Sequence, residues 1–280
     1  MPELAYLNGE YLPIEKTLVP IEDRGYQFGD AVYEFIASYN GRLFYLEEHL
    51  DRLERSLKGL SFPPVSRDAI RQAVETLFEK AGISRAGVYI QISRGVAPRN
   101  HAFPAASECQ VVMTVRAIEE KPAEFRKNGA AAITVEDFRW GRCDLKTVQL
   151  LPNVLAKQKA LAAGAFDALF VSSEGVVREA TSSNLCIVAD KTLVTHPLTP
   201  RILPGITRQV VIDLCRELGI PIEERLFKTD ALFAADEVLL TGTVTEVLPI
   251  VTIDGRRIAN GQVGPVTTRL YETLRRRCGA

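Results

Sequence analysis

The stretch Arg142-Cys143-Asp144-Leu145-Lys146-Thr147 sets one lysine in a largely apolar run, which continues with Val148, Leu150 and Leu151. If this run packs inward, the Lys146 ammonium loses part of its hydration, and such an amine can act as a nucleophile at neutral pH. Taken alone, a lysine of this kind more often stands at a strand end with its charged tip in water. Both interpretations of Lys146 stay open on this stretch alone.

A second polar stretch, Glu179-Ala180-Thr181-Ser182-Ser183-Asn184, joins one carboxylate to a run of hydroxyl side chains. A carboxylate beside small hydroxyl groups matches a cofactor that has a pyridinium nitrogen and a phosphate. Glu174-Gly175 marks a turn just before it, so Glu179 alone could also be a surface carboxylate. The combination with Lys146 is what favours a cofactor site.

The composition excludes several classes of protein. Of the 280 residues, 46% are hydrophobic and 25% charged, as in a soluble globular protein of one large or two ordinary domains. The 34 basic and 35 acidic residues give a net charge of −1 without a long block of one sign, which argues against a nucleic-acid partner. The five cysteines are widely spaced and form no CxxC pair, so neither a disulfide framework nor a metal site is expected.

The sequence pattern predicts no targeting or membrane segment. Its N-terminus, Met1-Pro2-Glu3-Leu4, has no basic segment followed by an apolar core. No apolar run approaches the ~20 residues of a spanning helix. We therefore expect a cytoplasmic protein without a membrane partner.

The first part of the chain has the pattern of an α+β domain. The expected elements are Asn-Gly hairpin turns at 8–9 and 40–41, strands over 31–39, 42–45, 88–93 and 110–115, and helices over 46–60 and 66–82. Ser66 is expected to cap the second helix and Gly82 to end it. Strands at both ends of two helices favour α+β architecture over alternating βαβ units.

A charged stretch that is poor in apolar residues, 116–128, separates the two halves of the chain. We therefore expect an N-terminal domain at 1–117, a linker at 118–128 and a C-terminal domain at 129–280. The elements expected in the C-terminal domain are strands over 130–135, 166–172, 185–188, 192–195, 238–240 and 248–253, and helices over 151–163, 206–218 and 266–275. Asn153 is expected to cap the first of these helices.

Taken together, these stretches resemble the fold-type IV pyridoxal-phosphate enzymes, which include D-amino-acid transaminases, branched-chain aminotransferases and aminodeoxychorismate lyase. The motifs that carry the resemblance are Glu22-Asp23-Arg24-Gly25-Tyr26-Gln27-Phe28-Gly29-Asp30, His49-Leu50-Asp51-Arg52-Leu53, 153–157, 179–184 and Ile202-Leu203-Pro204-Gly205-Ile206-Thr207-Arg208. Nearly the whole chain is covered, and it is most similar to the D-amino-acid transaminases. The resemblance implies two domains: a small N-terminal α+β domain and a larger C-terminal α/β, barrel-like domain that binds pyridoxal 5'-phosphate.

The resemblance also implies roles for individual residues. Lys146 would form the Schiff base with the cofactor and move the substrate proton, and Glu179 would pair with the pyridinium nitrogen. The other cofactor contacts would be Arg52, Ser182, Ser183, Ile206, Thr207 and Thr243. The roles of Ile206 and Thr207 are also supported without the resemblance. Both lie in the first turn of the expected helix over 206–218, where the backbone N–H groups are free to bind a phosphate. Without the resemblance, Arg52 would be a solvated charge on the polar side of its helix.

The loop from Arg94 to His101 concerns the substrate. Arg99 and His101 on one proline-containing loop could hold a carboxylate through charge-assisted hydrogen bonds, although a plain polar loop would have the same composition. The resemblance assigns Arg99 and His101, reaching over from the partner subunit of a homodimer, to the substrate α-carboxylate. Tyr33 of the same subunit would join them, with the active site at the subunit interface.

The function expected is transamination between D-amino acids, of the D-alanine, D-glutamate or D-aspartate type, and 2-oxo acids such as 2-oxoglutarate and pyruvate. It would proceed by a ping-pong mechanism of two half-reactions, one with the amino acid and one with the oxo acid. Two alternatives share the fold: a branched-chain L-amino-acid aminotransferase and an aminodeoxychorismate lyase. The Arg-x-His arrangement on the loop separates these subfamilies and favours the first function. A third alternative, a non-catalytic binding protein of this fold, is disfavoured by the presence of both Lys146 and Glu179.

Overall fold

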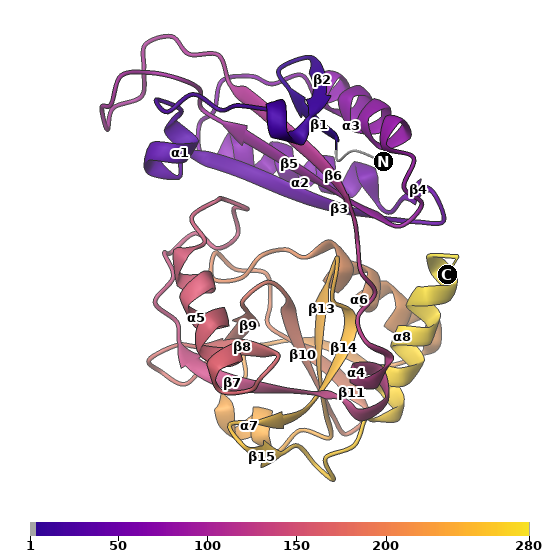
Figure 1. Cartoon of the computed structure of the whole chain (residues 1–280). Coiled ribbons are helices and arrows are strands. Elements are labelled where there is room, and N and C mark those ends of the chain that lie inside the picture. Colours follow the sequence, from indigo (N-terminus) through magenta and orange to yellow (C-terminus); the bar gives the residue numbers. More distant parts are fainter. Residues whose placement is uncertain (1–3, 280) are drawn as a thin grey trace. The chain divides into compact units, whose positions relative to one another are not determined.

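The structure is a computed structural model of the chain and describes residues 4–279 (Figure 1). Residues 1–3, on which the expectation about the N-terminus partly rests, lie outside this range. The chain divides into two compact units: the first extends to Glu119 and includes Leu145–Gln149, and the second consists of Glu120–Asp144 and the chain from Leu150 onward. The range expected as a linker, 118–128, contains a short helix, α4 (Ala123–Asn128).

The first unit is built on one antiparallel sheet. Its strands are β1 (Leu4–Leu7), β2 (Glu10–Pro13), β3 (Ala31–Tyr39), β4 (Arg42–Leu43), β5 (Ala86–Ser93) and β6 (Gln110–Ala117), in the order β2-β1-β6-β5-β3-β4. The two expected Asn-Gly turns are confirmed, because Asn8 and Asn40 take φ values of 49° and 48° in the turns that join β1 to β2 and β3 to β4.

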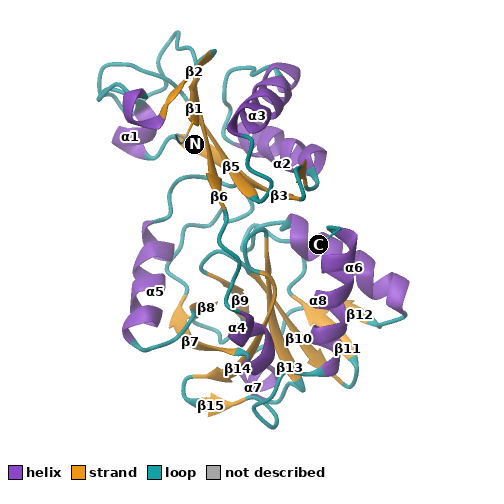
Figure 2. Ribbon diagram, turned by 45° about the vertical axis from the view of Figure 1, so that its right-hand side comes forward, coloured by secondary structure: helices purple, strands orange, loops and turns teal. Residues whose placement is uncertain are grey.

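Helices α2 (Leu46–Gly59) and α3 (Arg67–Ala81) lie together on one side of this sheet (Figure 2). They were expected at these positions, and the Ser66 hydroxyl caps α3 by accepting from the Ala69 N–H at 3.3 Å. Their leucines pack with the inward residues of the strands into one core. Two short helices in the first unit were not expected: the 3₁₀ turn η1 (Ile14–Lys16) and α1 (Arg24–Phe28).

The segment Leu145–Gln149 adds to the edge of β3. Thr147 pairs with Val32 in an antiparallel bridge. The Tyr33 N–H donates to the Lys146 carbonyl at 2.9 Å. The segment therefore belongs to the first unit although it lies far along the chain, which local sequence patterns do not reveal.

The second unit contains a ring of strands. Its strands are β7 (Ala130–Glu136), β8 (Asp167–Val171), β9 (Val177–Ala180), β10 (Asn184–Ala189), β11 (Thr192–Thr195), β12 (Ile222–Glu224), β13 (Glu237–Gly242), β14 (Glu246–Ile253) and β15 (Arg256–Arg257). Pairing runs β10-β13-β14-β7-β8-β9, and β9 pairs back to β10 at Glu179 and Asn184. This closure confirms the barrel-like domain that was expected, and it places Glu179 at the closing contact.

Helices α5 (Leu151–Ala162), α6 (Ile206–Leu218), α7 (Thr229–Phe233) and α8 (Pro265–Arg277) surround these strands (Figure 2). The expectation that Asn153 caps α5 is wrong: Leu150 is the N-cap, because Pro152 suits the first turn, and the Asn153 side chain donates to the Thr181 carbonyl at 2.8 Å. None of the helices between residues 4 and 279 has the length and apolar composition that crossing a bilayer requires.

Candidate active site

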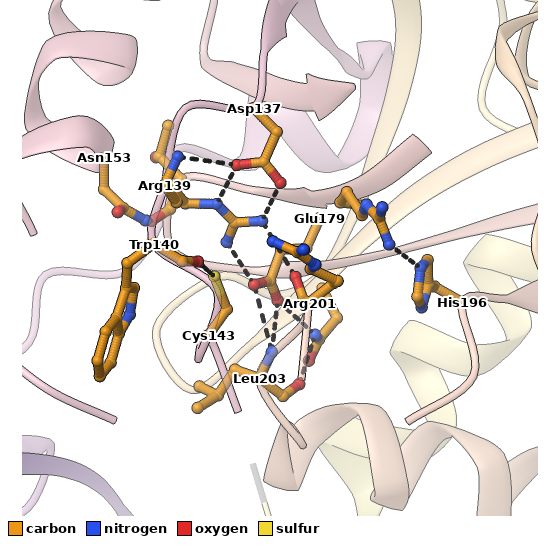
Figure 3. Close-up of polar contacts among 12 residues, drawn as sticks. Asp137, Arg139, Trp140, Cys143, Asn153, Glu179, His196, Arg201 and Leu203 are labelled. Atoms are coloured by element: carbon orange, nitrogen blue, oxygen red, sulfur yellow. Dashed lines mark hydrogen bonds and ion pairs between the residues drawn. The ribbon is translucent and has the colours of Figure 1, made fainter. Parts of the chain in front are cut away.

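Glu179 is a buried carboxylate with three protein donors (Figure 3). The Arg139 guanidinium donates to it at 2.6 Å and the Asn184 side-chain amide at 2.9 Å. The Leu203 N–H lies 3.1 Å and 3.2 Å from its two oxygens. These contacts come from the loop after β7, from β10 and from the segment before α6, so the side chain is held from several sides.

Arg139 is itself divided between two carboxylates. Two of its nitrogens bind Asp137, each at 2.9 Å, and a third binds Glu179 (Figure 3). It also donates to the Arg201 carbonyl at 3.2 Å and lies over the Phe170 ring, 4.2 Å from the centroid. Arg139 therefore has a fixed position, and its charge is shared between Asp137 and Glu179.

The pKa of Glu179 is raised above its ordinary value. Burial is the largest cause, the charge and hydrogen bonds of Arg139 and the Leu203 N–H oppose it, and the Asp137 charge adds to the increase. Ionised Glu179 is thus incompletely compensated by the protein. A further cation at this carboxylate, such as a protonated ring nitrogen, would stabilise its charged form.

The N-terminus of α6 offers free backbone donors. Gly205 is its N-cap and no side chain caps it, so the N–H groups of Ile206 and Thr207 have no helical partner. A side chain at position 205 would overlap the side-chain oxygen of Asn184, which explains the glycine. This terminus can hold an anion through its N–H groups and its dipole.

Three hydroxyl groups of the second unit are further candidates for binding a ligand. Between residues 4 and 279, the hydroxyls of Ser182, Thr207 and Thr243 make no hydrogen bond to another protein group, so each is available to a ligand. Ser183 differs, because its hydroxyl donates to that of Thr245 at 3.0 Å. A buried carboxylate, an uncapped helix terminus and available hydroxyls fit the ring nitrogen and the phosphate of pyridoxal phosphate.

Lys146 has its backbone fixed in the first unit. Its N–H donates to the Ser56 hydroxyl at 3.1 Å, and its carbonyl accepts from the Tyr33 N–H. Its ammonium lies 4.1 Å from the centroid of the Tyr33 ring, a cation–π contact. The structure therefore brings Lys146 and Tyr33 together, with Lys146 half-buried between the buried residues Leu145 and Thr147.

Arg52 is buried, and it is not the solvated charge that its helix pattern alone suggested. It binds both oxygens of Glu34, at 2.6 Å and 2.9 Å, and His49 lies 2.7 Å from the same carboxylate. Burial opposes ionisation of Glu34, yet Arg52 and His49 outweigh it and hold the pKa of Glu34 below its ordinary value. Burial lowers the pKa of His49. The hydrogen bond and charge of Glu34 oppose this shift, while the charges of Arg52 and Lys146 add to it.

Arg99 and His101 lie on one exposed loop of the first unit. The Arg99 guanidinium lies 4.5 Å from the centroid of the Phe28 ring, and the His101 ring centroid lies 5.5 Å from it. The structure therefore gathers these two basic side chains at one aromatic ring. Two adjacent basic groups exposed to solvent can take a carboxylate in paired hydrogen bonds.

Sequence reasoning missed three side chains of these clusters: Glu34, Arg139 and Asn184. One signal was present for Glu34, which falls between Val32 and Ile36 on the buried face of an alternating strand. A carboxylate at such a position needs a buried cationic partner. No comparable signal marks Arg139, because the carboxylate it binds at the site, Glu179, lies 40 positions away in the sequence.

Comparison with known proteins gives consistent matches over most of the chain. The family model of amino-transferase class IV matches residues 31–253. D-alanine aminotransferase of Bacillus licheniformis is 42% identical over 268 residues, which cover 95% of this chain and 94% of that protein. Among solved structures, the branched-chain amino acid aminotransferase of Escherichia coli has a TM-score of 0.91 and 27% identity, covering 98% of this chain and 94% of its own. The T.th. branched-chain amino acid aminotransferase with pyridoxamine 5'-phosphate has a TM-score of 0.92 and 28% identity, covering 100% and 95%.

Proposed function

Because this chain belongs to the class IV aminotransferase family, as an aminotransferase that uses pyridoxal phosphate, we propose that it transfers amino groups between D-amino acids and 2-oxo acids. D-alanine and D-glutamate are the D-amino acids we infer, with pyruvate and 2-oxoglutarate as the oxo acids. The names of the curated relatives at about 40% identity support this substrate class.

The observation that carries the proposal is the pairing of Arg99 and His101 at the Phe28 ring. In this proposal the two side chains hold the substrate α-carboxylate, together with Tyr33. A carboxylate pinned on one side of the cofactor fixes which enantiomer directs its Cα hydrogen toward Lys146. We infer that this enantiomer is the D form.

The chain's own residues would perform the remaining steps. Pyridoxal phosphate, when bound, supplies an electron-withdrawing ring that takes up charge from the substrate Cα. Lys146 would hold the cofactor covalently and, once released, move the Cα proton with its amine. Glu179, oriented by Asn184 and the Leu203 N–H, would accept a hydrogen bond from the ring nitrogen. The phosphate would be held by Arg52, the hydroxyls of Ser182, Ser183, Thr207 and Thr243, and the N–H groups of Ile206 and Thr207.

We further propose that the chain is a homodimer in which Arg99 and His101 of one subunit serve the partner subunit's site, and that residues 129–280 are the cofactor-binding domain. Mixing Lys146→Ala chains with Arg99→Ala chains tests the shared site. If the loop serves the partner, a hybrid dimer has one wholly wild-type site and regains part of the activity. Demonstrated subunit exchange without recovery would show that the loop does not serve the partner.

A screen of D- and L-amino acids against 2-oxoglutarate and pyruvate tests the substrate class. We expect turnover of D-alanine and D-glutamate and far slower turnover of the L enantiomers. Efficient transamination of L-leucine with D-amino acids left untouched would reject the proposal.

A second candidate is a branched-chain L-amino-acid aminotransferase. The specific observation that favours it is the fit of the whole chain to solved enzymes of that name, with TM-scores of 0.91 and 0.92. Those proteins are only 27% and 28% identical to this chain, whereas the curated D-alanine aminotransferase is 42% identical. The same screen separates the two candidates.

A further inference from the structure

The motif Glu22 to Asp30 has no role in the chemistry described so far, yet it is joined to the loop that carries Arg99 and His101. Asp23 pairs with Val96 in an antiparallel bridge. The Arg24 N–H donates to the Gly95 carbonyl at 3.0 Å, and the Ala97 N–H donates to the Glu22 carbonyl at 3.3 Å. The base of the loop is thus held by backbone hydrogen bonds to this motif.

The Arg24 side chain reaches the tip of the same loop. Its guanidinium donates to three consecutive backbone carbonyls, those of Asn100 at 2.6 Å, His101 at 3.4 Å and Ala102 at 3.3 Å. The Arg24 residue is only 3% exposed. Because a buried guanidinium must satisfy several donors, these carbonyls and the arginine stabilise each other's positions.

Asp30, the last residue of the motif, fixes the orientation of this guanidinium. It accepts from Arg24 at 2.9 Å and from Arg94 at 2.8 Å. Arg94 in turn donates to the carbonyls of Leu60 and Ser61, at 2.8 Å and 2.9 Å. One carboxylate therefore ties Arg24 to the start of the loop and to the end of α2.

Phe28 completes the arrangement from within α1. Its ring lies 4.8 Å from the Arg24 guanidinium, 4.5 Å from that of Arg99 and 5.5 Å from the His101 ring. Both side chains that are proposed to bind substrate thus contact the same ring, which Arg24 also contacts. An arginine that rests on an aromatic face loses less rotamer freedom when it binds a ligand.

Gly95 allows the loop to leave β5 in this direction. Its φ is +110°, a conformation that side chains rarely adopt, and a Cβ there would overlap the Glu108 carbonyl. The Ser93 hydroxyl, just before it, donates to Asp23 at 2.6 Å. The same motif is therefore bonded to the loop at its base and at its tip.

We propose that Arg24 and Phe28 are positioning residues that hold Arg99 and His101 in the geometry that binds the substrate carboxylate. This inference rests on the proposed function, since it assumes that Arg99 and His101 contact that carboxylate. Arg24 acts through the loop backbone and Phe28 through the two side chains. Neither touches substrate or cofactor, so their effect is on substrate affinity and not on the proton transfer.

Steady-state kinetics of Arg24→Met and Phe28→Leu enzyme test the proposal. For Arg24→Met we expect kcat/KM for D-alanine to fall about 10- to 100-fold, mostly through KM, because two side chains must then be ordered during binding. Phe28→Leu keeps the apolar contact but loses the ring, and we expect a fall of about 3- to 10-fold. Hydrogen exchange of the amides at 99–103 should rise in Arg24→Met, while cofactor binding stays at the wild-type level.

The matched control is Arg85→Met. Arg85 precedes the first residue of β5, donates to the Ser38 carbonyl at 2.9 Å and lies 4.0 Å from the Tyr39 ring, so it has the same kinds of contact at the other end of the strand. It should leave the KM for D-alanine and the exchange at 99–103 unchanged. An equal rise in KM in this control would show that the effect is not specific to the contacts of Arg24 with the loop, and it would overturn the proposal.

The outcomes separate this inference from the proposed function. If Arg99→Ala raises the KM for D-alanine and Arg24→Met does not, the positioning role is wrong while the substrate role of Arg99 stands. If Arg99→Ala leaves this KM unchanged, the substrate assignment of the loop fails first. Should Arg24→Met not fold, Arg24→Lys, which keeps the ion pair with Asp30, replaces it; a wild-type KM in both Arg24→Lys and Phe28→Leu would overturn the proposal.

Discussion

Each unit contains a buried glutamate that is hydrogen-bonded to an arginine, yet the pKa values of the two glutamates are shifted in opposite directions. The pKa of Glu34 in the first unit is lowered, although burial opposes its ionisation. The pKa of Glu179 in the second unit is raised, because burial outweighs its partners. Burial and an arginine neighbour therefore do not by themselves decide the charge of a carboxylate.

The difference lies in how each arginine is used. Arg52 gives two hydrogen bonds to Glu34, and His49 adds a third. Arg139 gives one to Glu179 and two to Asp137, whose charge also raises the pKa of Glu179. Glu34 is thus compensated by the protein alone, as in a structural ion pair. The charge of Glu179 is compensated less completely, so a further cation would stabilise its ionised form, as expected of a carboxylate that binds a cationic group of a ligand.

The largest effect on turnover is expected for Lys146→Ala. Lys146 lies in the first unit, where its charge acts on His49, the partner of Glu34. In the proposed function, Lys146 is the reactive group of the first unit, and Glu34 only pairs with Arg52. The Lys146→Ala variant therefore loses both the nucleophile that binds the cofactor and the base that moves the Cα proton. Turnover should fall by at least about 10²- to 10⁴-fold, the range typical of general acid–base catalysis. Steady-state assays with D-alanine and pyruvate measure it.

The attachment site gives the control for Lys146. Borohydride reduction of the loaded enzyme and peptide mapping should place the label on Lys146. The Lys159→Ala variant, which removes a lysine of α5, should keep wild-type labelling and turnover. Label on Lys157 or Lys159 instead would contradict the assignment.

The second prediction concerns stability. Glu34→Ala leaves Arg52 as a buried charge without its carboxylate, and we expect the free energy of unfolding to fall by about 3–5 kcal/mol. Glu47, which pairs with Arg67 and Arg71 at the surface, provides the matched control, and Glu47→Ala should have a far smaller effect because water screens its pairs. Denaturant titrations measure both. Equal decreases in the free energy of unfolding of the two variants would show that Glu34 and Arg52 do not form a stabilising ion pair.

The third prediction concerns rate. Glu179→Gln keeps the size and the hydrogen bonding of the side chain but removes its charge, so the half-reaction with D-alanine should slow by about 10- to 150-fold, the equivalent of ~1.5–3 kcal/mol for a charged hydrogen bond. Glu237, a buried glutamate that accepts from Val266 and Thr267 in the same unit, is the control. Glu237→Gln should lower stability and leave the single-turnover rate unchanged. A wild-type rate in Glu179→Gln would contradict the role assigned to the carboxylate.

The sequence predicted most of the fold because its signals are local. Ser66 and Gly82 bound α3 as expected, and Gly205 and Gly219 bound α6. The short strand β9 was missed, since it is defined by its pairing with β8 and β10 and not by its own pattern. The capping error at Asn153 has a related origin, because its partner is the distant Thr181 carbonyl.

Individual residues of the site could be predicted from the sequence, but the contacts between them could not. Motifs identified Lys146, Glu179 and Arg52, but not what each of them touches. Helical periodicity placed Arg52 on a polar face and could not tell a solvated charge from one that pairs with a buried glutamate. The opposite pKa shifts of Glu34 and Glu179 depend on contacts between distant segments, which no local pattern contains.

The smallest expected effect is the pH dependence of folding, and it tests the comparison directly. The lowered pKa of Glu34 means that its contribution to stability is present above its ordinary value and is lost as the pH falls through the folded pKa. The raised pKa of Glu179 acts in the opposite sense. Its contribution is present below the ordinary value and is lost as the pH rises through the folded pKa.

The variants Glu34→Gln and Glu179→Gln should therefore change the profile on different sides of the ordinary glutamate pKa of 4.5. In cofactor-free protein, urea titrations from about pH 3 to pH 7 should show that Glu34→Gln flattens the acid-side loss of stability. In the wild type, the raised pKa of Glu179 should make the free energy of unfolding decrease as the pH rises above that value, with a slope of at most about 1.4 kcal/mol per pH unit for one group. Glu179→Gln should remove this decrease. Added pyridoxal phosphate should suppress the second difference, because the ring nitrogen then compensates the Glu179 charge. Profiles that change in the same direction in both variants would show that the two carboxylates do not differ in the way the structure indicates.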